Sequence, residues 1–165
     1  MKPDTAAVAT RERVRLQAGA TIVAFTWATD RWGHEIRNAA GRCWLSIEGA
    51  DKGADPRWPQ SPVLTEVSLE QIAGKPALFG VGLAGRSHFS LCVTVHPSLE
   101  DTLLFESACR IHSVAGRLGS SYRADDGHAV CIEPGAPFPA PSATVCWTYT
   151  AGPDGILSVN RAAGG

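Results

Sequence analysis

Several features are missing from this sequence, and each absence removes a class of protein. No apolar run approaches the roughly 20 residues that a membrane-spanning helix requires. The segment from Met1 to Gln17 is charged and lacks the apolar stretch of a signal peptide. Charged residues form only 19% of the chain, the net charge is −1, and no basic stripe marks a nucleic-acid-binding face. We therefore expect neither a membrane nor a nucleic acid among the partners.

Metal and redox motifs are also missing. The five cysteines include no C-x-x-C pair, and the five histidines include no H-x-H or H-E-x-x-H spacing. Each cysteine lies in an apolar run, where a free thiol behaves as a small core residue. We expect reduced thiols and hence a cytoplasmic protein, with a structural disulfide or two as the alternative. No metal and no cofactor is predicted.

Helical periodicity is absent too, and alternating segments dominate instead. No window of about 11 or more residues repeats apolar side chains every 3.6 positions. Short segments with a two-residue period are separated by glycine and proline, and they predict an all-β protein. We expect an antiparallel β-sandwich or partly open β-barrel of roughly nine to eleven short strands. The predicted strands are 21–27, 31–36, 43–48, 63–69, 77–83, 87–95, 102–111, 119–123, 128–132, 144–150 and 155–159.

The length of 165 residues predicts a single domain, 1–165. Residues 1–10 are predicted to form a loose lead-in. Residues 50–62 and 134–142 are rich in proline, which fixes φ and removes a backbone donor, so we expect extended loops there rather than central strands. The weak helix candidate is Ser98 to Leu104, with Ser98 as its N-cap. Residues 124–127 are predicted to form a hairpin loop in which glycine takes a positive φ.

The stretch from Gly80 to Gly85 spells G-x-G-x-x-G, which in dinucleotide-binding proteins joins a strand to a helix. The residues that follow, Ser87 to Val95, alternate as a strand does and are rich in residues that favour strands. A phosphate-binding loop needs a helix N-terminus for its amides and its dipole. We therefore interpret the motif as a hairpin turn in which glycine supplies a positive φ.

The strands on and after this hairpin suggest a ligand-binding face. His88 and Ser90 share one side of the second arm, and Glu106 and Arg110 share one side of the next strand. If these two sides coincide, they form a shallow floor that fits a small polar ligand or the side chain of a partner. The alternative is a solvated sheet face that carries a Glu–Arg pair.

Two glycines of the first arm leave space on one side of the sheet. Glycine within a strand often marks the close approach of a ligand or of another backbone. We expect Gly80 and Gly82 to lie beside Ser90 and Cys92, so that the space is either used by a ligand or covered by another element.

Aromatic residues outside the clearest strands complete the candidate site. Trp58 lies on a proline-rich loop, where an aromatic ring can stack on a sugar or anchor a partner, or can fold over the core instead. Trp32 lies near a bend, and His34 follows it in the same segment. The candidate ligand-binding residues are therefore His88, Ser90, Glu106, Arg110, Trp32, His34 and Trp58.

These observations predict a non-catalytic β domain that binds a protein partner or a small polar ligand. No G-x-S-x-G elbow for covalent catalysis is present. The alternative is an enzyme, with or without a metal, whose site joins His88, Glu106 and Arg110, with His34 as a further candidate. In such a site a glutamate acts as general base and an arginine holds an anionic group. A third hypothesis is a homo-oligomer formed through an exposed sheet edge.

Overall fold

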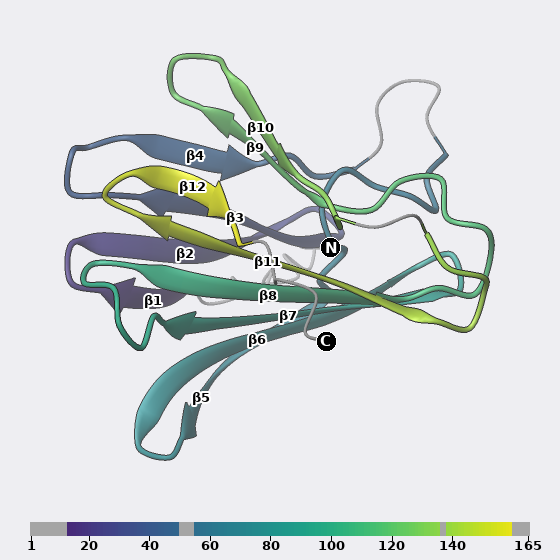
Figure 1. Ribbon diagram of the computed structural model, residues 1–165, viewed down its shortest axis with the longest axis horizontal. Helices are drawn as coiled ribbons and strands as arrows, with labels where there is room; N and C mark the ends of the chain where they lie inside the picture. The colour runs from purple at the N-terminus through teal and green to yellow at the C-terminus, as the bar shows by residue number, and fades with distance from the viewer. Residues whose placement is uncertain (1–12, 50–54, 136–137, 160–165) are drawn as a thin grey trace, which may run out of the picture.

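The protein folds into two stacked β-sheets, as Figure 1 shows. The computed structural model describes residues 13–49, 55–135 and 138–159. Within these ranges there are twelve strands and no helix, each sheet has six strands, and every neighbouring pair is antiparallel. The sheets do not close into a barrel. The predicted all-β sandwich is confirmed.

Sheet A has the spatial order β1-β2-β3-β4-β9-β10, and sheet B has the order β12-β11-β8-β7-β6-β5. The strands of sheet A are β1 (Val14–Ala18), β2 (Thr21–Ala28), β3 (Arg31–Arg37), β4 (Cys43–Ser46), β9 (Ser120–Ala124) and β10 (Ala129–Ile132). The strands of sheet B are β5 (Glu66–Ile72), β6 (Lys75–Ala84), β7 (Ser87–Val95), β8 (Leu103–Arg110), β11 (Thr144–Gly152) and β12 (Gly155–Ser158).

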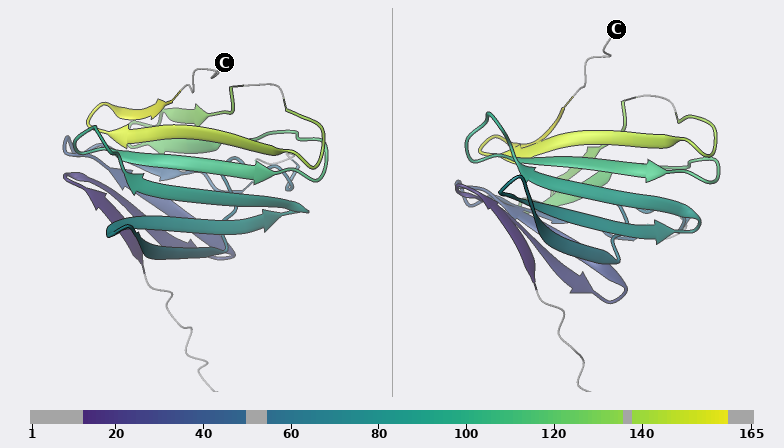
Figure 2. Two further views of the ribbon diagram at one scale, coloured as in Figure 1. Left: turned by 60° about the horizontal axis from the view of Figure 1, so that its bottom comes forward. Right: turned by 90° about the horizontal axis from the view of Figure 1, so that it is seen from below.

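The chain crosses between the sheets after β4, after β8 and after β10. The hairpin β9–β10 therefore extends sheet A beside β4, and the hairpin β11–β12 extends sheet B beside β8. The two views of Figure 2 show the resulting layers, with the yellow and light green hairpins at the same side of the molecule. Each sheet is thus assembled from two separated parts of the sequence.

The core lies between the two sheets and follows from the two-residue period of the strands. In β7, the inward residues Phe89, Leu91 and Val93 are buried, whereas the intervening positions face outward and are exposed or half-buried. The facing positions of both sheets contribute one continuous cluster of apolar side chains. Its largest fully buried members include Trp44, Tyr122, Tyr149, Phe25 and Phe105.

A crossing segment, residues 55–65, joins β4 to β5 at one end of the sandwich, and we call it the strap. The backbone N–H of Trp32 on β3 donates to the carbonyl of Leu64 (2.8 Å). The N–H of Thr65 donates to the carbonyl of Val81 on β6 (2.9 Å). The strap is therefore hydrogen-bonded to both sheets and closes the space between them.

The G-x-G-x-x-G motif forms the β6–β7 hairpin, as the sequence predicts. Ala84 pairs with Ser87, and the two-residue turn between them begins at Gly85, which has φ +58°. This left-handed conformation is one that glycine adopts without steric cost. The loop after β9 behaves as expected as well, because Gly127 has φ +88°.

The positions of three elements differ from the sequence-based expectation. The strand β1 was not predicted, and β5 begins at Glu66 rather than at Val63. No helix forms at 98–104, which contains a turn and the start of β8. No strand forms in the described parts of the two proline-rich loops, which are 55–62, 134–135 and 138–142. The predicted lead-in, 1–10, lies outside the described residues.

All five cysteines are free thiols. Cys109 is fully buried, and burial raises the pKa of its thiol to about 12. No helix that could cross a membrane is found in the described ranges.

Candidate functional site

The outer face of sheet B brings together part of the predicted ligand-binding set. The β7–β8 register places His88 directly opposite Arg110 and Ser90 directly opposite Ala108. Directly opposite residues of an antiparallel pair point to the same side of the sheet. His88, Ser90 and Arg110 are all exposed, so this side faces away from the core.

A shallow depression of about 410 Å³ lies over these residues. Its polar lining comes from His88, Ser90 and Arg110 together with Thr65, Glu66 and Thr144, and its apolar wall comes from Val81 and Leu83 of β6. Val81 is 49% exposed and Leu83 is 52% exposed, which is high for large apolar side chains. We call this surface the sheet B depression.

His88 on β7 and Arg110 on β8 supply groups that attract anions, whereas Glu66 lies on β5, on the far side of β6. The ring of His112 lies 5.6 Å from the ring of His88, measured between centroids. Arg110 has no ion-pair partner among the described residues. Its guanidinium donors are therefore available to a ligand.

Glu106 lies on the same side of the sheet but outside the depression. It is opposite Cys92 and four residues from Arg110 along β8. At about 3.3 Å per residue, the two Cα atoms are roughly 13 Å apart. His88 and Arg110 are thus brought together, while Glu106 does not join them at one point.

No family model, no curated protein and no solved structure matches this chain. Its function is therefore argued from the chemistry of its own surfaces.

Trp32 and Trp58, predicted as ligand contacts, are buried instead. Trp58 is only 4% exposed, and its ring lies against Gly116. Trp32 is part of the core and lies edge-to-face with Trp27. Both side chains pack in the core, because burying a large aromatic surface stabilises the fold more than exposing it to water does.

The glycines of β6 also lie on the side opposite to the one predicted. The β6–β7 register pairs Gly80 with Leu91 and Gly82 with Phe89, so both glycines face the core and not Ser90. A Cβ on Gly82 would clash with the carbonyl oxygen of Val63 in the strap. The strap fills the space left by these glycines, with the backbone of Val63 beside Gly82 and the side chain of Leu64 beside Gly80.

His34 is likewise buried, and it also borders a cavity on the outer face of sheet A. Its ring stacks on Phe25 and its Nε2 lies 2.8 Å from the hydroxyl of Tyr122. That hydroxyl in turn lies 2.6 Å from the hydroxyl of Tyr149 on the opposite sheet. Burial lowers the pKa of His34 to about 3, so the imidazole is neutral at physiological pH.

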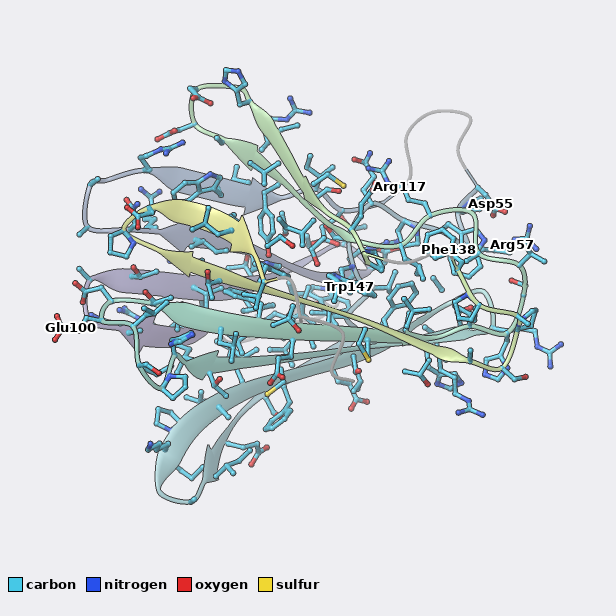
Figure 3. The ribbon with its side chains drawn as sticks, in the orientation of Figure 1. Asp55, Arg57, Glu100, Arg117, Phe138 and Trp147 are labelled. Carbon is cyan, nitrogen blue, oxygen red and sulfur yellow. The ribbon has the colours of Figure 1, made fainter. Side chains whose placement is uncertain are left out.

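Figure 3 shows how the labelled charged residues are distributed around this core. Asp55, Arg57 and Arg117 gather with Phe138 at the end of the sandwich where the strap lies, and Glu100 lies at the opposite end. Asp55 and Arg57 form an ion pair at the surface, with Nη2 of Arg57 2.6 Å from Oδ2 of Asp55. Phe138 is exposed.

Sequence reasoning missed Glu48, the carboxylate with the most unusual surroundings. Its Oε1 accepts a hydrogen bond from the Ser46 hydroxyl (2.7 Å), whose oxygen accepts one from the backbone N–H of His34 (2.9 Å). Burial raises the pKa of Glu48 to about 7. No local sequence pattern marks Glu48, since it follows a short strand and precedes a glycine, as many exposed residues do.

The described residues contain no group of three or more His, Cys, Asp and Glu side chains placed to hold a metal ion. The sheet B depression and the cavity beside Glu48 both combine polar and apolar walls.

Proposed function

We propose that this protein is a non-catalytic binding domain whose sheet B depression holds a ligand with an anionic group next to an apolar one. The observation that carries this proposal is the direct pairing of His88 with Arg110 on an open sheet face. The ligand belongs to a small molecule or to the side chain of a protein partner.

The anionic group is assigned to β7 and β8 because of the donors there. Arg110 presents a planar set of N–H donors that matches a carboxylate in two parallel hydrogen bonds. His88 lies directly across the strand pair, and Ser90 supplies a hydroxyl one pair further along the same face. A charge-assisted hydrogen bond of this kind contributes about 1.5–3 kcal/mol.

The apolar group is assigned to β6. Val81 and Leu83 project from the same face, opposite Ser90 and His88 respectively. Each carries roughly half of its surface in water in the free protein. Covering them with an apolar ligand contributes about 25 cal/mol for each Å² that is removed from water.

The separation of Glu106 argues against the predicted catalytic site of His88, Glu106 and Arg110. A general base must come within hydrogen-bond reach of the proton that it removes. Glu106 lies roughly 13 Å along β8 from Arg110, so one small substrate does not contact both groups closely.

The proposal is tested by NMR titration with hexanoate, with the uncharged hexanamide as a matched probe. Hexanoate is expected to shift the amide signals of Val81, Ser90 and Ala108, and hexanamide to bind at least about tenfold more weakly. Arg110→Ala should weaken hexanoate binding about tenfold or more. Arg123→Ala, which removes an exposed arginine from sheet A, is the control. Equal hexanoate binding by the two variants would contradict the proposal.

A further inference from the structure

A second cavity, of about 510 Å³, lies on the outer face of sheet A, away from the sheet B depression. Its walls come from alternate residues of β2, which are Ala24, Thr26 and Ala28, together with Leu45 of β4. These side chains are short or apolar, and Glu48 lies among them. We call this space the Glu48 cavity.

The carboxylate of Glu48 is only half satisfied. Oε1 accepts the hydrogen bond from Ser46, which has a single hydroxyl proton to donate. Oε2 is buried and has no hydrogen-bond partner among the residues that the structure describes. A buried acceptor without a partner costs about 1–3 kcal/mol, and more when it is charged.

The neighbouring cations are engaged by other carboxylates. Arg31 donates to both oxygens of Asp30, at 2.9 and 3.1 Å. Arg13 and Arg37 both contact Oε1 of Glu35, at 2.8 and 3.4 Å. No ion pair to Glu48 forms within the described ranges.

Gly33 lines the Glu48 cavity next to the side chain of Glu48. A Cβ built on Gly33 would lie 3.5 Å from Cγ of Glu48 and 3.6 Å from Oγ of Ser46, both ordinary van der Waals distances. The position therefore tolerates alanine, although glycine occupies it. Gly33 lines the cavity, so the absent methyl group adds to the cavity beside Cγ and Oε1 of Glu48.

We propose that the Glu48 cavity binds a primary alkylammonium group, which donates a hydrogen bond to the Glu48 carboxylate and lays its alkyl stem on Ala24, Ala28 and Leu45. The head supplies the positive charge that no ion pair among the described residues gives to this carboxylate. The ligand is a free alkylamine or the side chain of a lysine, because these share the same head and stem.

Binding at this site is linked to a proton. Below pH 7 the Glu48 carboxyl is largely protonated in the free protein, because burial raises its pKa to about 7. An ammonium ion favours the ionised carboxylate, so its binding releases a proton. The other titratable and charged groups around Glu48 are Asp30, Arg31, Glu35, Arg13, Arg37, His34, Tyr122 and Tyr149.

The test is a calorimetric and NMR titration of the full chain with n-butylammonium at pH 6.5. Tetramethylammonium, which has the charge but no N–H donor, is the matched probe. We expect saturable binding of butylammonium, at least tenfold weaker binding of tetramethylammonium, and proton release that is detected by comparing buffers of different ionisation enthalpy. Shifted amides should include Gly33 and Ser46.

Two variants separate the site from a general effect of charge. Glu48→Gln keeps the shape and the acceptor for Ser46 but should weaken butylammonium binding at least tenfold and abolish proton release. Gly33→Ala keeps the carboxylate, narrows the cavity and should weaken binding at least fivefold. Glu70→Gln, an exposed change on β5, is the control and should bind as the wild type does.

The measured affinities decide whether the proposal stands. Absence of saturable butylammonium binding, or equal affinity for Glu48→Gln and Glu70→Gln, would overturn the proposal. If Glu48→Gln fails to fold, an unchanged affinity in Gly33→Ala overturns it equally. A parallel titration with Nα-acetyl-lysine amide identifies the source: binding as tight as that of butylammonium supports a lysine side chain, and weaker binding supports a free amine.

Discussion

At the scale of single residues, Gly82 occupies a position where a larger side chain would clash with the backbone of the strap. Its inward side touches the carbonyl of Val63, so Gly82→Ala forces the strap away from β6. We expect this change to lower the free energy of unfolding by about 1–3 kcal/mol, as overpacking does. The measurement is urea denaturation. Gly135→Ala is the control because nothing lies near that position, and equal stability of the two variants would contradict this account.

The buried carboxyl of Glu48 makes stability depend on pH. Its pKa is 4.5 in an unfolded chain and about 7 in the fold, so the folded state holds the proton more tightly. The stabilisation is therefore complete below pH 4.5 and is lost as the pH rises to about 7, by up to about 3 kcal/mol. The stability of the wild type relative to Glu48→Gln should fall across this window in urea titrations. A difference that does not change with pH would contradict the burial of a titrating group.

His34 produces the opposite pH dependence. Burial lowers its pKa from 6.5 to about 3, so the unfolded chain binds the proton more tightly. Its contribution is present above pH 6.5 and is lost as the pH falls, by at most about 1.4 kcal/mol per pH unit. His34→Phe should flatten the stability profile between pH 3 and 6.5. His128→Phe, which changes an exposed histidine, should leave the profile as it is in the wild type.

The positions of some candidate site residues can be predicted from the sequence, and those of others cannot. Alternation alone puts His88 and Ser90 on one side of β7, and this side proves to be exposed. The partner across the strand pair depends on register, which no local pattern encodes. Trp58 and Glu48 are buried by segments that are distant in sequence. Their burial could therefore not be predicted from the residues next to them in the chain.

At the scale of elements, the strap makes the two sheets depend on each other. The Ser61 hydroxyl donates to the carbonyl of Ser121 on β9 and accepts from its N–H, each at 3.1 Å. Ser61→Ala leaves the buried N–H of Ser121 without this acceptor, whereas the Ser121 carbonyl still accepts from the N–H of Ile47 (2.8 Å). We expect a loss of about 1–3 kcal/mol in the free energy of unfolding. Ser158→Ala, an exposed change on β12, should be neutral. Hydrogen exchange at the Ser121 amide provides the check, and unchanged protection would refute the role of the strap.

Most strands follow from alternation and turn residues, and the exceptions have physical causes. The strand β1 was missed because it is short and because its outward positions, Arg15 and Gln17, extend the charged N-terminal segment. The start of β5 was placed too early because Val63 and Leu64 resemble a strand. Val63 and Leu64 are consecutive in sequence and are both buried, because the strap passes between the two sheets. The alternation of a strand begins only after them.

At the scale of the whole molecule, the order of the strands makes the two sheets inseparable. Residues 120–158 supply one hairpin to sheet A and one to sheet B. A cut after Val114, which is 81% exposed, separates β1–β8 from β9–β12. Neither fragment then holds a complete sheet, and the Tyr122–Tyr149 contact falls within the smaller one.

We expect neither fragment to fold alone and the mixture to regain native structure. Loss of β9–β12 exposes the edges of β4 and β8 and removes several of the largest core side chains. Tryptophan fluorescence and NMR dispersion of residues 1–114, of 115–165 and of their mixture provide the measurement. Cooperative unfolding of 1–114 by itself, with the wild-type midpoint, would show that the last two hairpins are not needed for folding.

Because the last two hairpins belong to different sheets, we expect neither sheet to be completed until late in synthesis of the chain. The first eight strands emerge as two incomplete layers, each lacking the hairpin that extends it. Neither layer is completed until β9 and β11 have followed, so the nascent chain stays exposed to proteases and chaperones until nearly all of its strands have emerged. We therefore expect prematurely terminated products of this chain to be degraded rather than to accumulate as stable fragments.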